Sequence, residues 1–315
     1  MSIEPLESAS LAELQQTPID NVMNIIDEGL VHLPTYRELY YRWERQQWQS
    51  QEIDFSADRQ QWLSMTEEER GAHLGSFAAF FLGEAYVADT LAPYITAMPD
   101  EEMRLFTTTQ LADEARHTIF FSRFFSEVLE LDKGRMEETV AAIEQNIGEG
   151  LRFILVNALT DISKRIREQP QNLEYLVEGV TLYHVIVEGT LALAGQHGML
   201  DFYRQNNFFP GFRAGFTAVA RDESRHIIFG VKFLREMLAR DAKYASVVAN
   251  VINMYGPGAI MGLIGSDEEV QLALANGRDP WETARYGANS LRKKLKVIGL
   301  EMNLDWLEVP APPLA

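Results

Sequence analysis

The sequence contains no cysteine, which excludes disulfides, thiolate metal ligands and a cysteine nucleophile. Basic residues are also scarce: 28 Lys and Arg stand against 46 Asp and Glu, and the formal net charge is −18. A chain with this charge repels phosphate backbones, so we do not expect a nucleic-acid partner. The first residues form neither a basic nor an apolar segment of the kind found in secretory signals, and the expected location is therefore cytoplasmic.

A hydrophobic run typical of a membrane span is missing as well. The longest uncharged stretch, residues 244–265, contains Gly-Pro-Gly, and we expect it to form a kinked or interrupted core helix. Apolar residues recur at steps of three and four between residues 60 and 241, and no strand-like alternation competes with them. The pattern predicts an all-α chain that forms a single domain over residues 1–315.

Terminal signals indicate where the first long helices begin and end. Ser64 and Glu67 fit a capping box at the start of the first long helix. Asp100 can cap the second, because a carboxylate before a helix accepts from its free N–H groups. We expect this second helix to end near Gly134, since glycine readily adopts the left-handed conformation that follows a helix.

Three more helices complete the expected bundle. A third is predicted over residues 136–168, long enough to cross the molecule between two helix pairs. The fourth holds residues 175–195, and the fifth begins near the Pro-Gly pair at residue 210. These helices predict a four-helix bundle with additional helices, whose core spans residues 64–240.

The fold prediction depends on two near-identical pentapeptides, DEARH and DESRH, which lie about a hundred residues apart. Residues three apart in a helix are separated by about 60° around the axis and about 4.5 Å along it. Glu114 therefore shares a helix face with His117, and Glu223 shares one with His226. Each pair can bind one metal ion, and the repeat indicates two equivalent half-sites that face each other.

A glutamate in apolar surroundings precedes each pair by about one helix. Glu84 lies in SFAAFFLGEAYVADTLA and Glu188 in LYHVIVEGTLALAG. An unpaired carboxylate in such surroundings costs several kcal/mol, so it must be protonated, ion-paired or bound to a metal. One glutamate followed by Glu-x-x-His, written twice, is the ligand set of di-metal carboxylate bundles, so the pattern predicts a ferritin-like bundle whose metal-binding core spans residues 64–240. The predicted metal ligands are Glu84, Glu114, His117, Glu188, Glu223 and His226.

Four carboxylates and two imidazoles suit iron and manganese better than copper(I) or a structural zinc ion. Four negative charges balance two divalent ions, and open coordination positions would remain for dioxygen. Asp113 and Asp222 each precede a predicted ligand glutamate. We expect each aspartate to accept the outer N–H of the histidine on the opposite helix, although pairing with a nearby arginine is the alternative.

These motifs, together with WQSQEIDFSADRQQW, GEAYVADTLAPYITAM and YHVIVEGTLAL, resemble the ribonucleotide reductase small-subunit superfamily. Within it, the chain is most similar to the ligand-binding oxidases, over about residues 43–240. The resemblance implies a homodimer with a mixed Mn/Fe centre that reduces dioxygen and holds a long-chain fatty acid; it leaves the electron donor open. It also implies that manganese is held by Glu84, Glu114 and His117, with Glu114 bridging, and iron by Glu188, Glu223 and His226.

Further positions distinguish members of the superfamily. Radical-generating small subunits usually have a tyrosine four residues after the first ligand histidine, where this chain has Phe121. In the oxidases, a valine three residues after the first glutamate becomes joined by an ether bond to a tyrosine five residues before the third glutamate. Val87 and Tyr183 occupy those places, so the resemblance implies this cross-link, although both could be ordinary core residues. His184 is expected to be a packed polar residue near the site rather than a seventh ligand.

Two other functions stay open at this point. A tyrosine-free reductase small subunit would generate a Mn/Fe oxidant for a catalytic partner subunit, through a C-terminal tail that carries a tyrosine. Here the last tyrosine is Tyr286, and the sequence ends in DWLEVPAPPLA. Iron storage on a ferritin-like bundle is the second alternative, but cage-forming proteins are usually shorter and lack the helices expected after Asp241. The sequence favours the oxidase over both.

Overall fold

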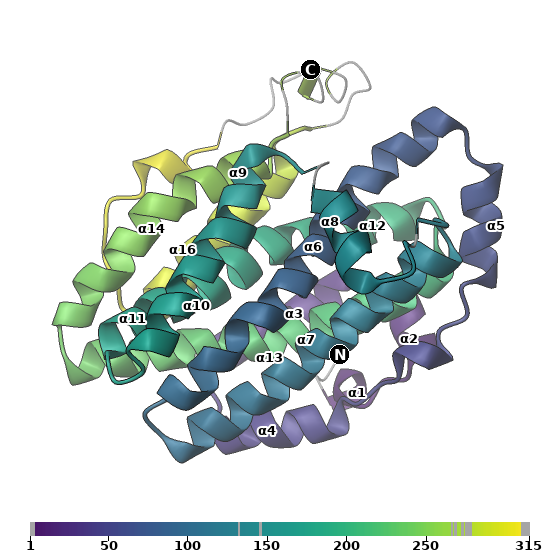
Figure 1. Cartoon of the computed structure of the whole chain (residues 1–315). Helices are drawn as coiled ribbons and strands as arrows, with labels where there is room; N and C mark the ends of the chain where they lie inside the picture. Colours follow the sequence, from purple (N-terminus) through teal and green to yellow (C-terminus); the bar gives the residue numbers. More distant parts are fainter. Residues whose placement is uncertain are drawn as a thin grey trace.

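The computed structural model describes residues 4–131, 133–144, 147–265, 267, 270–271, 274 and 279–309, and within these ranges it contains helices but no strand. It confirms the all-α, ferritin-like bundle expected from the sequence (Figure 1). The elements are α1 (Glu4–Glu7), α2 (Leu11–Gln16), α3 (Ile19–Val31), α4 (Tyr36–Arg45), η1 (Ser50–Glu52), α5 (Ser56–Ser64), α6 (Glu67–Ala97), α7 (Glu101–Glu127), α8 (Met136–Glu144), α9 (Glu149–Arg152), η2 (Phe153–Ala158), α10 (Leu159–Glu168), α11 (Leu173–Val180), η3 (Thr181–Ala192), α12 (Leu193–Gln205), α13 (Pro210–Arg240), α14 (Lys243–Gly262), α16 (Glu282–Ile298) and η4 (Asp305–Leu307).

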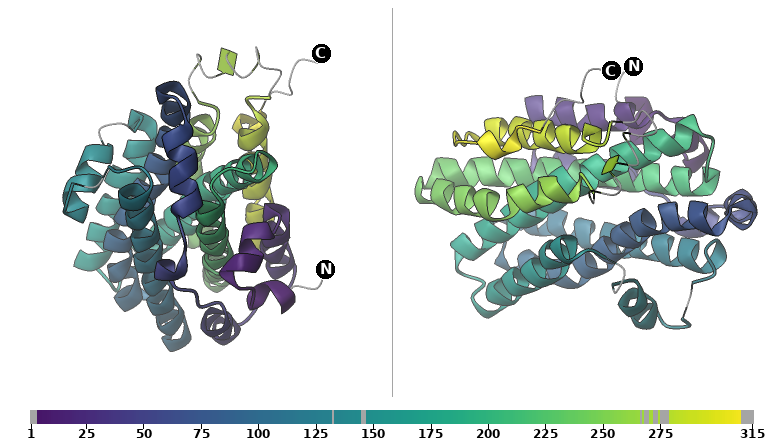
Figure 2. Two further views of the ribbon diagram at one scale, coloured as in Figure 1. Left: turned by 90° about the vertical axis from the view of Figure 1, so that its right-hand side faces the viewer. Right: turned by 90° about the horizontal axis from the view of Figure 1, so that it is seen from above.

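Four long segments form the bundle core: α6, α7, the continuous segment α11–η3–α12, and α13. Helix α6 packs along α7, and η3 packs against α13. The N-terminal helices α2 and α3 cover α13, α4 covers α7, and α14 and α16 pack on η3. Both views in Figure 2 show α16 (yellow) on the opposite side of the bundle from α7. The predicted limits of a single domain over 1–315 with a core at 64–240 stay predictions.

Helix α13 lies at the centre of the molecule, because every residue from Gly211 to Val231 is buried. A helix that is buried on all sides belongs to a core rather than to a surface. Its start is fixed from a distance: Pro210 occupies the first position, and the buried Asp58 carboxylate accepts from the backbone N–H groups of Gly211 (2.8 Å) and Phe212 (2.7 Å). The second pentapeptide therefore lies deep in the core.

The predicted start of the first long helix is wrong by two residues. Ser64 is the last residue of α5, and its hydroxyl donates to Gln61 O at 2.7 Å. The capping box is formed instead by Thr66 and Glu69: the Thr66 hydroxyl accepts from Glu69 N at 3.2 Å, and the Glu69 carboxylate accepts from Thr66 N at 2.7 Å. The sequence SMTEEE contains both patterns, and the second one is used. Asp100 caps α7 as predicted.

Two further predictions of helix ends are wrong. Helix α7 ends at Glu127, well before Gly134, although Gly134 does adopt a positive φ of 87° in the loop that follows. The single helix expected over 136–168 is divided into α8 and the continuous segment α9–η2–α10. The sequence between them includes Gly148, and glycine lowers the helix propensity there by about 1 kcal/mol relative to alanine.

The uncharged stretch at 244–265 forms most of α14, which continues through Pro257 to Gly262 without the expected interruption. Among the described residues, one helical segment, Leu173–Gln205, is long and apolar enough by composition to cross a membrane. However, 89% of its most apolar window is buried inside the molecule. A buried core helix of a globular bundle gives the same signal. In the middle of this segment, Thr181–Ala192 forms a π-helix, η3.

Candidate metal centre

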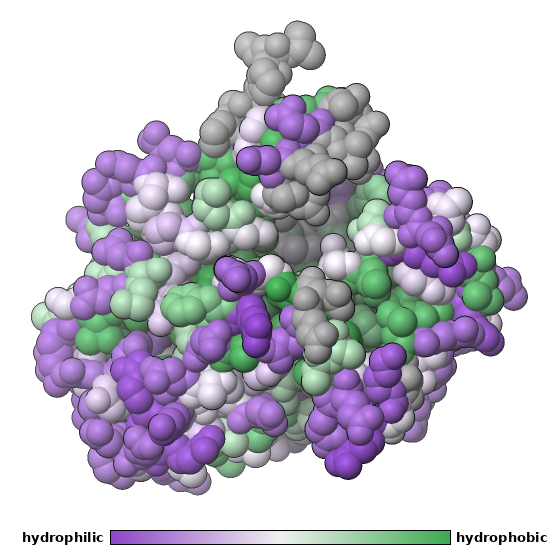
Figure 3. All heavy atoms as spheres, turned by 45° about the horizontal axis from the view of Figure 1, so that its top comes forward, coloured by the Kyte–Doolittle hydropathy of each residue, from purple (hydrophilic) through white to green (hydrophobic). Residues whose placement is uncertain are grey.

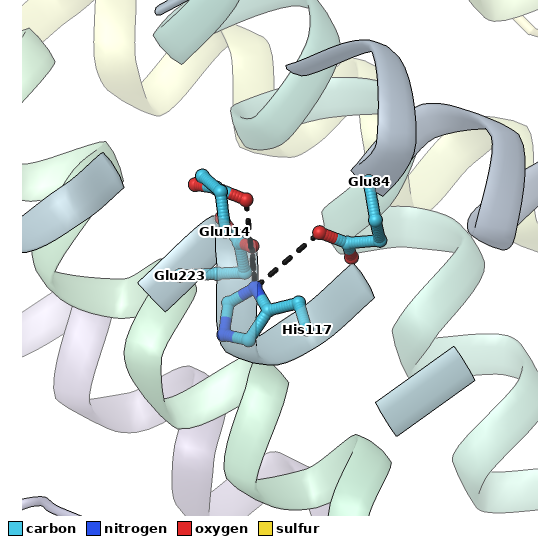
Figure 4. Close-up of side chains that lie close together, drawn as sticks. All are labelled: Glu84, Glu114, His117 and Glu223. Atoms are coloured by element: carbon cyan, nitrogen blue, oxygen red, sulfur yellow. Dashed lines mark hydrogen bonds and ion pairs between the residues drawn. The ribbon is translucent and has the colours of Figure 1, made fainter. Parts of the chain in front are cut away.

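Four core elements each contribute glutamate or histidine side chains to one buried cluster. Helix α6 provides Glu84, α7 provides Glu114 and His117, η3 provides Glu188, and α13 provides the last pair. All six side chains predicted from the sequence as ligands are buried. Figure 4 shows four of them, from three helices, pointing toward one another. They fall into two groups of possible ligand atoms within 4.8 Å of one another: Glu84, Glu114, His117 and Glu223, and Glu114, Glu188, Glu223 and His226.

In the first half-site, His117 Nδ1 faces three carboxylates. It lies 3.3 Å from Glu84 Oε2, 3.5 Å from Glu114 Oε2 and 3.5 Å from Glu223 Oε1. One nitrogen can donate only one proton at a time, so a single hydrogen bond cannot satisfy this arrangement. A cation between the nitrogen and the three carboxylates, however, could be bound by all of these atoms at once.

The second half-site repeats the arrangement around His226. Its Nδ1 lies 3.3 Å from Glu114 Oε1, 3.3 Å from Glu188 Oε1 and 3.3 Å from Glu223 Oε2. Glu114 and Glu223 thus present one oxygen to each histidine. Because these two carboxylates belong to both groups, their geometry suits bridging positions between two ions.

Each histidine is held from behind by the aspartate on the opposite pentapeptide. His117 Nε2 lies 3.2 Å from Asp222 Oδ2, and His226 Nε2 lies 3.1 Å from Asp113 Oδ2. An N–H donated by Nε2 leaves the lone pair on Nδ1, which faces the glutamates. The two crossed contacts therefore orient both rings so that Nδ1 can bind a metal ion.

The same two aspartates also bind the arginines of the pentapeptides. Arg225 donates to Asp113 at 2.7 Å and to Asp222 at 2.9 Å, and Arg116 donates to Asp222 at 2.9 Å and contacts Asp113. Burial alone would raise the pKa of Asp222, but both guanidinium groups outweigh it and hold this pKa well below its usual range. Pairing with arginine and orienting the histidines, which the sequence presented as alternatives, thus occur together.

Two tryptophans that the sequence analysis did not select complete this network. Trp43 Nε1 donates to Asp113 Oδ1 at 3.0 Å, and Trp48 Nε1 donates to Asp222 Oδ2 at 2.7 Å. The indole of Trp48 also lies nearly parallel to the ring of His117, with a centroid distance of 6.3 Å. Both tryptophans occur in the aromatic-rich N-terminal part, about seventy residues or more from their partners, and no local pattern indicates such a contact.

Gln110 is a second residue that the sequence analysis missed. It is fully buried one helical turn before Glu114, and its Nε2 donates to Tyr183 OH at 3.2 Å and to Glu188 Oε1 at 3.1 Å. Its Oε1 lies 3.1 Å from Nε2 of His184, so His184 is a buried polar neighbour of the cluster, as expected. The Tyr183 hydroxyl in turn donates to Glu114 Oε1 at 2.8 Å. The tyrosine is thereby fixed against the cluster.

The electrostatics show how unfavourable this cluster is on its own. Burial raises the pKa of Glu84 to about 8, and burial together with neighbouring carboxylates raises that of Glu188 well above its usual range. Burial opposes protonation of the two imidazoles, yet the surrounding carboxylates raise the pKa of His117 and His226. The cluster therefore retains protons, which metal ions must displace.

The donor set fits two metal ions better than it fits an ordinary hydrogen-bond network. Oε2 of Glu188 and Oε2 of Glu223 are buried and have no hydrogen-bond partner among the described residues. Buried carboxylate oxygens that accept no hydrogen bond cost free energy unless a cation neutralises them. Oxygen and imidazole nitrogen are donors that manganese and iron accept readily. The cluster is thus suitable for a di-metal site.

A cavity of about 670 Å³ reaches this cluster from the surface. Its described lining includes glycines from α6, α9 and α12, apolar side chains, and four of the clustered glutamates, but neither lysine nor arginine. Val87 and Tyr183 both line it, next to the glutamates. Figure 3 shows this side of the molecule, where hydrophobic residues border a hollow near the centre of the view. Phe121 lies outside the lining, fully buried among phenylalanines.

Solved structures with the same fold carry Mn/Fe or Mn/Mn cofactors. One is a valine-to-isoleucine variant of R2-like ligand-binding oxidase with anaerobically reconstituted Mn/Fe cofactor; it is 26% identical, with a TM-score of 0.72, over 84% of this chain and 93% of that chain. A tyrosine-to-phenylalanine variant with aerobically reconstituted Mn/Fe cofactor matches with the same values. So does a glycine-to-leucine variant, which holds a non-activated Mn/Mn cofactor after aerobic reconstitution with Mn and Fe.

The family of this chain is identified from its sequence. The family described as "Ribonucleotide reductase, small chain" matches residues 31–255, which contain the bundle core and the whole cluster. The match covers more than half of the 315 residues. By its sequence, its helical bundle and its two-part Glu/His cluster, this chain belongs to the ribonucleotide reductase small-chain family.

Proposed function

We propose that this protein is a dioxygen-dependent Mn/Fe oxidase that binds a long-chain fatty acid or a similar apolar ligand and oxidises C–H bonds by two electrons. The observation that carries the proposal is a cavity of about 670 Å³ that joins the Glu/His cluster to Val87 and Tyr183. Solved R2-like ligand-binding oxidases of the same fold support it. Family membership makes the chain an oxidoreductase; the substrate class and the cross-link belong to the proposal.

In the proposed centre, manganese would be held by Glu84, Glu114 and His117, and iron by Glu188, Glu223 and His226. When bound, such a pair supplies the electrons that reduce dioxygen and the oxidising power that removes hydrogen from carbon. The protein supplies the geometry: crossed contacts from Asp113 and Asp222 fix both imidazoles. Glu114 and Glu223, which are shared between the two groups, would each serve both ions.

The cavity lining indicates what kind of ligand the protein accepts. Apart from Ser76 and Tyr183, its described walls are apolar or formed by glycine, and four buried glutamates are the only charged groups of this lining. A fatty-acid carboxylate would find no lysine or arginine along these walls, so bound metal ions are its expected partners. The alkyl chain would then extend along the apolar walls toward the surface, where each buried CH₂ contributes about 0.8 kcal/mol.

We propose that Val87 and Tyr183 become joined by an ether bond. The bond forms between a carbon of Val87 and the phenolic oxygen of Tyr183; each residue loses one hydrogen, and dioxygen is the oxidant that takes up both. Tyr183 is prepared for this step, because its hydroxyl donates to Glu114 Oε1 at 2.8 Å and accepts from Gln110 at 3.2 Å. Both hydrogen bonds hold the phenolic oxygen beside the cluster.

The expected homodimer also has a structural basis. The outer face of α7 exposes Leu105, Thr108, Ala112, Ala115 and Ile119, a spacing of three and four residues that is typical of helix–helix seams. Leu105 and Ile119 are 52% and 45% exposed, which is unusual for large apolar residues on a core helix. A second copy of the same seam is the proposed occupant, because a self-complementary face produces a symmetric dimer.

Peptide mass spectrometry tests the proposed function. Metal-free protein is loaded with Mn²⁺ and Fe²⁺, exposed to air, digested and compared with an anaerobic sample. We expect a species lighter by two hydrogens, in which the peptides that contain Val87 and Tyr183 are joined. Tyr183→Phe, which lacks only the hydroxyl, is the matched control and should give separate peptides. Separate peptides from the loaded wild-type protein would instead favour a tyrosine-free reductase small subunit.

A further inference from the structure

A lysine from the C-terminal part of the chain is buried against the metal-binding segment. Lys294 on α16 has an exposed fraction of 1%, and its Nζ donates to the backbone carbonyl of Gly189 in η3 at 2.7 Å. The hydroxyl of Ser290, one turn earlier on α16, donates to the same carbonyl at 3.1 Å and contacts Nζ. Two side chains of α16 therefore bind one carbonyl, which directly follows Glu188 in sequence.

The π-helical geometry of η3 explains why this carbonyl is available. In a π-helix each N–H bonds five residues back, so a change from α to π geometry leaves carbonyls without the N–H they would have in a regular α-helix. Close approach also requires glycine at this position: a Cβ on Gly189 would lie 2.7 Å from Lys294 Cε and 2.7 Å from His184 O. The glycine thus admits the lysine to the backbone of η3.

An ion pair does not explain the burial of this lysine. No described carboxylate lies within ion-pair distance of Nζ. Burial lowers the pKa of Lys294 to about 7, against a smaller opposite effect of Asp27, which pairs instead with the exposed neighbour Lys293 at 2.7 Å. A buried lysine without a carboxylate is expensive compared with an apolar residue of similar size. The hydrogen bond to the Gly189 carbonyl offsets part of this cost.

We propose that Lys294 is a positioning residue for Glu188: by holding the carbonyl of Gly189, it fixes the π-helical turn that directs Glu188 into the cluster. This inference rests on the proposed metal centre. It also gives α16 a role in a site whose other residues all lie within the family match at 31–255. Glu84, by contrast, projects from the α-helix α6, which packs mainly against α7 and α10. The effect of Lys294 should therefore be confined to one of the two half-sites.

This proposal is tested by anaerobic titration with Mn²⁺ alone, in which calorimetry and Mn²⁺ electron paramagnetic resonance measure binding. Wild-type protein should bind two equivalents. In Lys294→Met, we expect one equivalent to bind about tenfold to a hundredfold more weakly, as for other residues that orient ligands, and the second to bind as in the wild type. Lys294→Gln, which keeps an N–H donor, should recover part of the affinity. Lys293→Met is the matched control, since that lysine is exposed.

Two results would overturn the proposal. One is a folded Lys294→Met protein that binds both equivalents with wild-type affinity. The other is equal weakening of both equivalents together with a lower melting temperature of the metal-free protein, because that pattern indicates a general structural role. If Lys294→Met does not fold, Ser290→Ala, which removes the other donor to the same carbonyl, is judged by the same criteria. A wild-type protein that binds no Mn²⁺ would refute the proposed metal centre itself, a separate outcome.

Discussion

His117 Nε2 lies 3.2 Å from Asp222 Oδ2, so the imidazole of one half-site is held by the helix that carries the other. The contact between His226 and Asp113 is its mirror image. Because each aspartate precedes a candidate ligand glutamate in sequence, movement of either helix would disturb both half-sites. The repeated pentapeptide thus provides mutual support of the two halves as well as two sets of candidate ligands.

Replacement of Asp222 tests this support. Asp222→Asn keeps the shape of the side chain but removes the charge that makes His117 a stronger ligand, so we expect metal affinity of the first half-site to fall by about tenfold to a hundredfold. Asp113→Asn should do the same for the second half-site. The control is Asp161→Asn, whose carboxylate is exposed. Anaerobic Mn²⁺ titration measures the effect, and unchanged affinity in both aspartate variants would contradict it.

Gln110 should control the yield of the proposed cross-link. Gln110→Leu removes the side-chain amide that donates hydrogen bonds to the Tyr183 hydroxyl and to Oε1 of Glu188. We expect the fraction of linked peptide, normalised to bound metal, to fall several-fold because the phenolic oxygen is no longer fixed. Gln196→Leu is a matched control, since Gln196 is also fully buried but belongs to α12 and does not line the cavity. Equal yields in the two variants would argue against a role for Gln110.

The cavity can be narrowed without disturbing the fold. Gly75 on α6 lines the cavity, and a Cβ there would meet no atom within 4 Å. Gly75→Leu should therefore fold, and its helix should be more stable than that of the wild type. The new side chain would occupy space that the ligand chain needs. If it displaces about two buried CH₂ groups, the affinity for a long-chain fatty acid falls about tenfold. Gly258→Leu, on the exposed face of α14, is the control. Retention of wild-type fatty-acid affinity in Gly75→Leu would mean that the ligand lies elsewhere.

Lys294 makes a definite prediction for stability against pH. Its pKa is lowered in the folded protein to about 7, from an ordinary value near 10.5. Between these values the unfolded chain binds more protons than the native state, so the free energy of unfolding rises with pH by at most about 1.4 kcal/mol per unit. We therefore expect the stability of metal-free wild type, relative to Lys294→Met, to increase from pH 7 toward pH 10. Urea unfolding at several pH values measures this difference, and a difference that stays constant would contradict the burial of an ionisable amine.

The sequence predicted the cluster because its signals are local. Glu-x-x-His can be recognised within one helical turn, and Glu84 and Glu188 stand out because their neighbours are apolar. Other residues of the site gave no such signal. Trp43 and Trp48 contact it from a distant part of the chain, and Gln110 belongs to no recognisable motif.

Errors in the fold have equally specific causes. The sequence offers two overlapping capping boxes, and that of Thr66 prevails over that of Ser64 because α5 continues through Ser64. Periodicity near 3.6 cannot separate an α-helix from a π-helix inside a wholly buried segment, so η3 was not predicted. The burial of Lys294 was not predicted either, because its partner Gly189 lies 105 residues away in the chain.

Metal content per chain tests the central claim most directly. Purified protein is loaded anaerobically with Mn²⁺ and Fe²⁺, desalted and analysed for both elements, beside Glu114→Ala and the exposed control Glu101→Ala from the same helix. We predict two metal ions per chain for the wild type and for Glu101→Ala, and loss of both from Glu114→Ala because this carboxylate faces both histidines. Wild-type protein that retains no metal, or Glu114→Ala that retains two ions, would contradict a di-metal centre at this cluster.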